Sequence, residues 1–160
     1  VNEGTYFSVS VPLKIDRDVS GEKSESTVRP TVDMHRKMAL LVEDNELNME
    51  IAEFLLEGEG MIVVKASNGK EAVEKFAASE VGGFDIIFMD VMMPVMNGLE
   101  ATKIIRESNT EIPIIMQTAY AFTADRENAM AAGASEVLVK PITLSTLRNC
   151  LSSYLPRLEW

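Results

Sequence analysis

The chain has 160 residues, 46% of them hydrophobic, and a formal net charge of -10. Residues 1–37 hold six acidic and six basic side chains, so the remainder carries the whole negative charge. A domain of that sign repels phosphate backbones, which argues against direct nucleic-acid binding and favours cations and basic partners. The single cysteine, Cys150, excludes an internal disulfide and a cysteine metal site. With no apolar run near the ~20 residues of a membrane span and no signal-like start, we expect a cytoplasmic chain without membrane contact, although a longer parent chain could be membrane-anchored.

The first residues differ in pattern from the rest of the chain. Residues 5–13 alternate apolar and polar side chains and predict one short strand ended by Pro12. Residues 16–33 are rich in serine and charge without an apolar period, which predicts a flexible linker. Since one strand cannot form a sheet alone, we divide the chain into a remnant strand at 1–15, a linker at 16–36 and a domain at 37–156.

From residue 38 onward, short apolar runs alternate with helical patterns. The runs are typical of strands buried on both faces of a parallel sheet, and they cover residues 38–42, 61–64, 84–89, 112–116 and 137–139. The apolar helix faces are expected at Leu47, Ile51, Phe54 and Leu55; at Ala72, Val73 and Phe76; at Leu99, Thr102 and Ile105; at Ala129, Met130 and Ala132, with Gly133 as the stop; and at Leu144, Leu147, Leu151 and Tyr154 or Leu155, with Thr143 as the cap. Five strand–helix units with right-handed crossovers predict a doubly wound α/β domain.

Polar residues follow the predicted strands at their carboxyl ends, where ligands of such sheets bind. The set comprises Glu43 and Asp44 after the first strand, Asp90 after the third, Gln117 and Thr118 at the fourth, and Lys140 after the fifth. Two like charges ~5 Å apart repel by about 3 kcal/mol at an effective dielectric near 20, so three carboxylates together call for a cation. Lys140 offsets part of that repulsion, and Mg2+ suits the remainder, with Mn2+ as a substitute ion.

A carboxylate beside a lysine and a hard cation is suited to phosphoryl transfer, because the equatorial oxygens of the phosphoryl group need neutralising. Asp90 leaves the most apolar strand with few polar neighbours, so we assign it as the nucleophile. Glu43 and Asp44 are adjacent, as a metal-binding pair would be; we expect Asp44 to be the closer ligand and Glu43 to act through water. Thr118 can hydrogen-bond a phosphoryl oxygen.

Four segments resemble the receiver domain of response regulators and hybrid histidine kinases: residues 40–45 (LLVEDN), 88–98 (FMDVMMPVMNG), 117–121 (QTAYA) and 139–142 (VKPI). The resemblance covers about residues 37–156 and implies a flavodoxin-like five-stranded sheet of order 2-1-3-4-5. It implies a phosphohistidine donor for Asp90, which is either a domain of the same chain or a histidine phosphotransfer protein. Homodimer formation stays open.

The same resemblance implies further roles. Mg2+ would be bound by Asp44, Asp90 and the backbone carbonyl of Met92, assisted by Glu43, with Thr118 and Lys140 as phosphate ligands. The Lys140–Pro141 bond would be cis, which proline makes inexpensive.

One position departs from the family pattern. Val137 stands where the family often has the aromatic ring of a conformational switch, so that switch looks incomplete. Output would then rely on the loop from Thr118 to Phe122, with Tyr120 as a substitute aromatic.

A second resemblance covers residues 4–13, which are similar to the closing strand of a histidine-kinase ATPase domain and suggest a piece of a hybrid sensor kinase. The nucleotide-binding residues of that domain are absent from the sequence, so we expect no ATP binding by this piece. We expect a phosphoacceptor rather than a turnover enzyme.

Two alternatives remain beside that interpretation. An aspartate-based phosphatase usually needs a second aspartate two residues after the nucleophile, and Met92 stands there. A phosphorylation-independent interaction module on the same fold would not need the complete acid–threonine–lysine set.

Overall fold

The computed structural model describes residues 34–119 and 123–155, so the predicted remnant strand and nearly all of the predicted linker lie outside the described residues. The described part contains five strands, namely β1 (Met38–Val42), β2 (Ile62–Ala66), β3 (Ile86–Asp90), β4 (Ile114–Thr118) and β5 (Glu136–Val139). Helices alternate with them as α1 (Glu46–Gly58), α2 (Gly69–Ala78), α3 (Gly98–Ser108), α4 (Thr123–Ala131) and α5 (Leu144–Tyr154).

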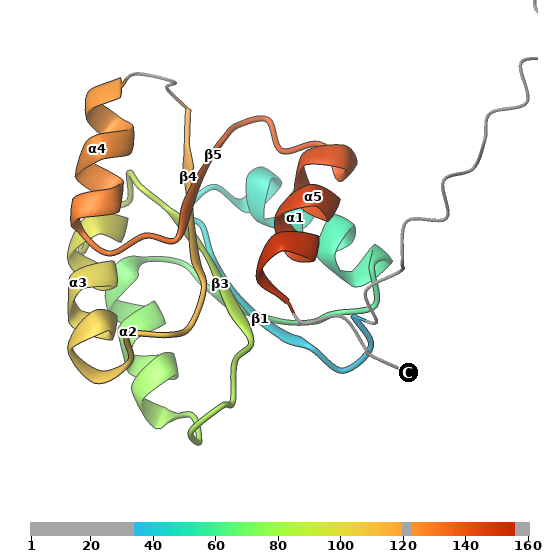
Figure 1. Ribbon diagram of the computed structural model, residues 1–160, viewed down its shortest axis with the longest axis horizontal. Helices are drawn as coiled ribbons and strands as arrows, with labels where there is room; N and C mark the ends of the chain where they lie inside the picture. Colours follow the sequence, from blue (N-terminus) through green and yellow to red (C-terminus); the bar gives the residue numbers. More distant parts are fainter. Residues whose placement is uncertain (1–33, 120–122, 156–160) are drawn as a thin grey trace, which may run out of the picture.

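The strands form one parallel sheet in the order β2-β1-β3-β4-β5, which confirms the predicted topology. Helices α1 and α5 cover one face of this sheet, and α2, α3 and α4 cover the other (Figure 1). Because all strands run the same way, their carboxyl ends share one edge. The side chains at that edge therefore come together from distant parts of the sequence.

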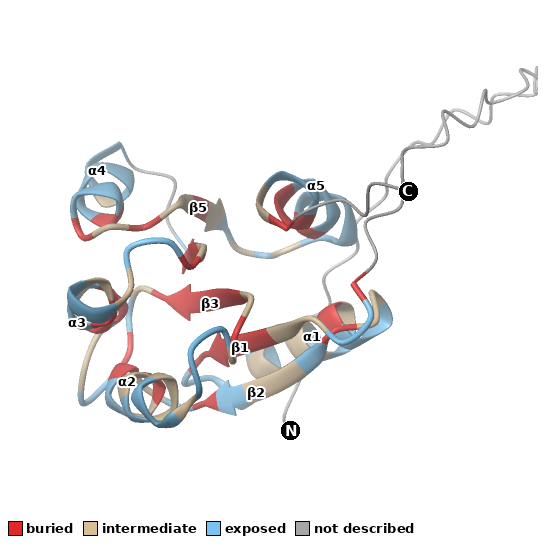
Figure 2. Cartoon of the chain, turned by 60° about the horizontal axis from the view of Figure 1, so that its bottom comes forward, coloured by how far each residue is buried: buried red, intermediate tan, exposed pale blue. Residues whose placement is uncertain are grey.

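Strands β3 and β4 are buried along their whole length, and Figure 2 shows β3 in the colour of buried residues. Successive residues contribute to opposite cores: Ile87 belongs to the cluster under α2, α3 and α4, and Phe88 belongs to the cluster under α1 and α5. Since both faces of these central strands need apolar side chains, their sequences are continuous hydrophobic runs instead of alternating ones.

Four helices begin at a polar N-cap residue that lies in the loop between a strand and the helix after it. The side chains of Asn45, Asn68, Asn97 and Thr143 each accept a hydrogen bond from the backbone N–H three residues later. Such a cap is typically worth about 1 kcal/mol. Thr143 is the cap predicted from the sequence, and Gly133, predicted as the stop after α4, has a left-handed φ of 101°.

The predicted buried face of α1 is wrong for three of its four residues. Leu47, Ile51 and Phe54 are 64%, 49% and 77% exposed, although the sequence pattern assigned them to the core. The fourth predicted residue, Leu55, does pack against the core under α1 and α5, and its neighbour Leu56, which was not predicted, is buried there. Helix α1 has apolar side chains on more than one of its faces. The helical period alone therefore could not decide which face packs against the sheet.

Candidate functional site

The carboxyl edge of the sheet brings the predicted polar residues together. The backbone N–H of Glu43 bonds to the carbonyl of Ala66, which extends the β1–β2 pairing by one residue beyond Val42. Asp90 ends β3 opposite Gln117 of β4, and the Lys140 N–H bonds to the carbonyl of Thr118 at 2.8 Å. The sheet register therefore places all of these side chains at one edge.

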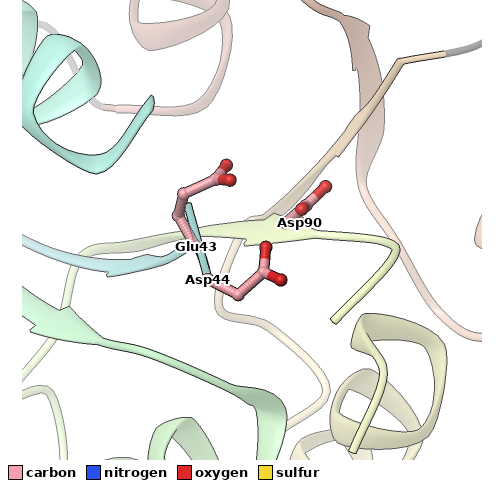
Figure 3. A group of neighbouring side chains, drawn as sticks. All are labelled: Glu43, Asp44 and Asp90. Atoms are coloured by element: carbon pink, nitrogen blue, oxygen red, sulfur yellow. The ribbon is translucent and has the colours of Figure 1, made fainter. Parts of the chain in front are cut away.

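Three carboxylates form the centre of the site (Figure 3). One oxygen from each of Glu43, Asp44 and Asp90 lies within 4.8 Å of the others. Glu43 and Asp90 are buried at 3% and 7% exposure, whereas Asp44 is exposed. The site therefore has a buried floor and one side open to solvent, through which a substrate can reach Asp90.

Lys140 is the cation that faces this cluster. Its Nζ lies 3.0 Å from Asp90 Oδ1 and also forms an ion pair with Glu43 Oε2. The other oxygen of Glu43 accepts hydrogen bonds from the Asn45 N–H at 3.3 Å and the Asn48 side-chain amide at 3.1 Å. Both carboxylate oxygens of Glu43 thus have partners within the protein, and Lys140 is the cation that pairs with it.

The environment disfavours the charged form of Asp90. Burial raises the pKa of its carboxyl above the usual range, and the carboxylates of Glu43 and Asp44 act in the same direction. Lys140 opposes this rise but does not cancel it. A divalent cation at the cluster would supply the missing positive charge and favour the ionised carboxylate.

The donor set fits a hard divalent ion. All three side chains offer oxygen, the exposure of Asp44 leaves room for water ligands, and one lysine cannot balance three carboxylates. Mg2+ prefers such sites, where a few carboxylates and several waters surround the ion. Asp44 and Asp90 are the side chains best placed to hold it, because the oxygens of Glu43 are already engaged.

The remaining predicted residues lie as follows. Thr118 is 5% exposed at the end of β4, and Val137 is buried in β5. The side chain of Met92 is 73% exposed in the loop after β3. The Lys140–Pro141 peptide bond is cis, in agreement with the resemblance. Tyr120 lies outside the described residues.

The sequence did not predict two side-chain features near the site, which involve Asn48 and Gln117. The side-chain amide of Asn48 donates a hydrogen bond to Glu43. The one sequence signal for this contact is the position of Asn48 in the first turn of a helix that begins beside the site. Gln117 is 2% exposed, and its amide Nε2 has no hydrogen-bond partner. An unpaired buried polar group costs about 1–3 kcal/mol of stability, so this amide needs an explanation.

Gly98 fixes the backbone behind Asp90. A β-carbon at position 98 would lie 2.1 Å from the Asp90 carbonyl oxygen and 2.9 Å from Met89 Cγ. No side chain fits there without moving the strand end that carries Asp90.

We expect Gly98→Ala to lower the free energy of unfolding by about 1–3 kcal/mol, as overpacking does in a tight core. Urea denaturation measures the change. Gly58→Ala is the matched control, because a β-carbon at position 58 would meet nothing within 4 Å and alanine favours the helix. Equal stability of the two variants would contradict the close packing behind Asp90.

Comparison with known proteins agrees with the fold and identifies the family. Residues 39–152 match the family described as the response regulator receiver domain. The chain is 31% identical to Histidine kinase 5 of Arabidopsis thaliana over 96% of its own length but only 19% of that protein. It is 34% identical to the response regulator DivK of Brucella anthropi, and the match covers 74% of this chain and 96% of that one.

Solved structures give the same result. The receiver domain of a sensor histidine kinase from Pseudomonas aeruginosa, solved with a magnesium ion in its active-site cleft, is 36% identical with a TM-score of 0.68 over 74% of this chain and 97% of that chain. The receiver domain of Ssk1, solved with the histidine phosphotransfer protein Ypd1 of Saccharomyces cerevisiae, is 29% identical with a TM-score of 0.69 over 76% and 90% of the two chains.

The fold and the site define a receiver domain of two-component signalling systems. This chain belongs to the response regulator receiver family, and its relatives include a hybrid signal transduction histidine kinase of Dictyostelium discoideum and the response regulator DivK. It spans less than a fifth of the length of Histidine kinase 5 from Arabidopsis thaliana. Among the described residues, every helix is too short or too polar to span a bilayer.

Proposed function

We propose that Asp90 accepts the phosphoryl group of a phosphohistidine donor in a Mg2+-dependent reaction. The observation that carries this proposal is the Asp90 carboxylate in a cluster of three acids with Lys140 Nζ 3.0 Å away. Phosphoryl transfer requires a nucleophile with a countercharge fixed beside it and a place for a cation, which Lys140 and the acid cluster provide.

In this reaction an Asp90 oxygen forms a bond to phosphorus while the bond from phosphorus to the donor imidazole nitrogen breaks. The leaving imidazole keeps the electron pair and takes up a proton. Lys140 is close enough to Asp90 to neutralise one phosphoryl oxygen. Thr118 is the last residue of the neighbouring strand β4, and its hydroxyl would donate a hydrogen bond to a second phosphoryl oxygen. Mg2+ bound by Asp44, Asp90 and the Met92 carbonyl would neutralise the remaining oxygen charge.

The donor has a surface to dock on beside this site. Helix α1 exposes Leu47, Ile51 and Phe54 as one stripe, and it carries acidic but no basic side chains. Asn48 of the same helix bonds Glu43 inside the site. We infer that the donor covers α1 with an apolar groove rimmed by basic residues, which would bring its histidine over Asp90.

The parent protein is, in this proposal, a hybrid sensor histidine kinase. This proposal is supported by the alignment to Histidine kinase 5 of Arabidopsis thaliana, which covers 96% of the chain and includes residues before the receiver fold. The donor would be a domain of that parent chain or a separate histidine phosphotransfer protein. After phosphorylation, movement near Thr118 would shift the face formed by α4, β5 and α5. Val137 cannot supply the aromatic switch, so Tyr120 is the candidate.

The test is incubation of the chain with a small phosphoramidate or acyl phosphate, followed by intact-mass measurement. We expect a gain of one phosphoryl group with Mg2+ or Mn2+ and none after chelation, because the buried acid cluster needs a divalent cation before a phosphoryl group can approach. No gain under any condition would favour the phosphorylation-independent interaction module instead.

A further inference from the structure

Val95, in the loop between β3 and α3, has a backbone conformation that valine rarely adopts. Its φ is 70°, and the N–H of Met96 donates to the carbonyl of Pro94 at 2.8 Å, which closes a three-residue turn around it. Three-residue turns with positive φ are rare and strained, and a β-branched side chain adds to the strain. Arg36 is the other non-glycine residue with positive φ in the described part of the chain, and it is not β-branched.

Hydrogen bonds hold this loop in place beside Asp90. The N–H of Gly98 donates to the carbonyl of Val91 at 3.0 Å, so the loop returns to the strand end that it left. The N–H of Gly69, the first residue of α2, donates to the carbonyl of Met96 at 3.0 Å. Because these bonds fix the loop near both of its ends, the backbone at the strained turn is held in its conformation.

The side chain of Val95 gains little inside the fold that would offset the strain. It is 79% exposed, so the folded chain buries little of its apolar surface. Glycine or asparagine would adopt the same backbone at a lower cost. Strain that persists next to a functional site points to a benefit in function, and what valine adds here is exposed apolar surface. Met92, which is 73% exposed in the same loop, adds a second apolar side chain.

Both side chains lie within the area that a protein donor must cover. Met92 is two residues from Asp90 and Val95 is three residues from Gly98, so the chain carries them at most about 7 Å and 11 Å away. Gly98 itself adjoins the acceptor, because a β-carbon there would lie 2.1 Å from the Asp90 carbonyl oxygen. Specific interfaces bury about 800 Å² on each partner, a patch roughly 16 Å in radius. A donor that brings its histidine to Asp90 therefore also reaches this loop.

We propose that Val95, together with Met92 of the same loop, is a recognition contact on which an apolar side chain of the phosphohistidine donor packs. The proposal rests on the proposed function and adds a contact on the side of Asp90 away from α1. Helix α1 covers one face of the sheet, whereas this loop leads into α3 on the other face (Figure 1). Donor binding thus spans the carboxyl edge of the sheet, which fixes the direction from which the histidine approaches Asp90.

Charge favours the donor over a second copy of this chain as the partner. The loop borders the cluster of Glu43, Asp44 and Asp90, and the residues from 38 onward carry the whole net charge of -10. Two copies that met at this edge would bring their acid clusters together, and like charges repel. A donor with basic residues around its histidine is attracted to the same edge.

The experiment compares Val95→Gly with Val81→Gly as a matched control. Val81 is fully exposed in the loop between α2 and β3, at the opposite edge of the sheet, and does not have a positive φ. The donor probe is Ypd1 phosphorylated on histidine, and a small phosphoramidate is the second donor. We expect Val95→Gly to lower the second-order rate constant with phosphorylated Ypd1 about tenfold, the worth of one buried valine side chain, and to leave the rate with phosphoramidate unchanged. Val81→Gly should match the wild type with both donors.

Thermal melting gives a second readout that needs no donor. Because Val95→Gly removes the strain, its melting temperature should exceed that of the wild type by about 2–5 °C. Val81→Gly removes no strain and makes the unfolded chain more flexible, so it should melt at the wild-type temperature or below it. Val95→Ile keeps the branched apolar side chain and should accept from Ypd1 at the wild-type rate.

The proposal is overturned if Val95→Gly accepts from Ypd1 at the wild-type rate, or if both donors slow equally, which would assign Val95 to the geometry of the acid cluster. A melting temperature of Val95→Gly below that of Val81→Gly overturns it too, because the side chain would then serve the fold. So does a wild-type dimer in light scattering that Val95→Gly dissociates, or a wild type that phosphoramidate phosphorylates and Ypd1 does not. A wild type that neither donor phosphorylates overturns the proposed function itself.

Discussion

Asp90→Asn is expected to abolish phosphorylation by any donor while leaving the fold intact. The amide keeps the shape of the side chain but has no anionic oxygen to attack phosphorus. Because burial raises the pKa of Asp90, the ionised carboxylate lowers the stability of the folded chain at neutral pH. We therefore expect Asp90→Asn to unfold at an equal or higher temperature than the wild type. Intact mass and thermal melting measure the two effects.

Asp125→Asn is the matched control for this variant, because it makes the same chemical change in the first turn of α4, outside the acid cluster. It should be phosphorylated at the wild-type rate. A phosphoryl group that is still gained by Asp90→Asn would place the acceptor elsewhere, and peptide mapping would identify it. Loss of structure in Asp90→Asn would instead mean that the Asp90–Lys140 ion pair holds this edge of the sheet together.

The strand ends are what the sequence predicted best. Apolar runs such as that leading to Asp90 define buried parallel strands, and the polar residue after each run must then lie at the shared edge. This reasoning brought Glu43, Asp44 and Asp90 together without knowledge of the helices, and the structure places their oxygens within 4.8 Å. The topology determines such a cluster, because the carboxyl ends of parallel strands all lie at the same edge of the sheet.

The side-chain pairings within the site were less predictable. The sequence suggested that Glu43 reaches a metal through water, which stays a prediction, but it did not predict the contacts of Glu43 with Lys140 and Asn48. These contacts depend on rotamers and on where α1 begins, which no spacing rule determines. The exposed stripe of α1 was missed for a related reason, because apolar residues on a docking face and on a core face obey the same helical period.

Lys140→Ala is expected to slow phosphorylation by roughly 10²–10³-fold, the usual loss when one preorganised charge at a transition state is removed. The same change leaves the buried carboxylate of Glu43 without its cation and exposes Asp90 to two like charges. Removing one partner from a fully buried ion pair costs about 3–5 kcal/mol, and the 18% exposure of the Lys140 side chain reduces this to about 2 kcal/mol.

The two effects of Lys140→Ala separate when Mg2+ is added. A divalent ion at the acid cluster replaces the lost positive charge, so millimolar Mg2+ should restore most of the stability measured by urea unfolding. It should not restore the rate, because Mg2+ cannot take the position of Lys140 beside the phosphoryl group. The control Lys65→Ala breaks a surface pair with Glu53 at 2.9 Å and should leave stability nearly unchanged with or without the ion. Equal losses of stability in both variants, or a rate that returns with Mg2+, would show that Lys140 balances charge in the resting site and has no part in the transfer.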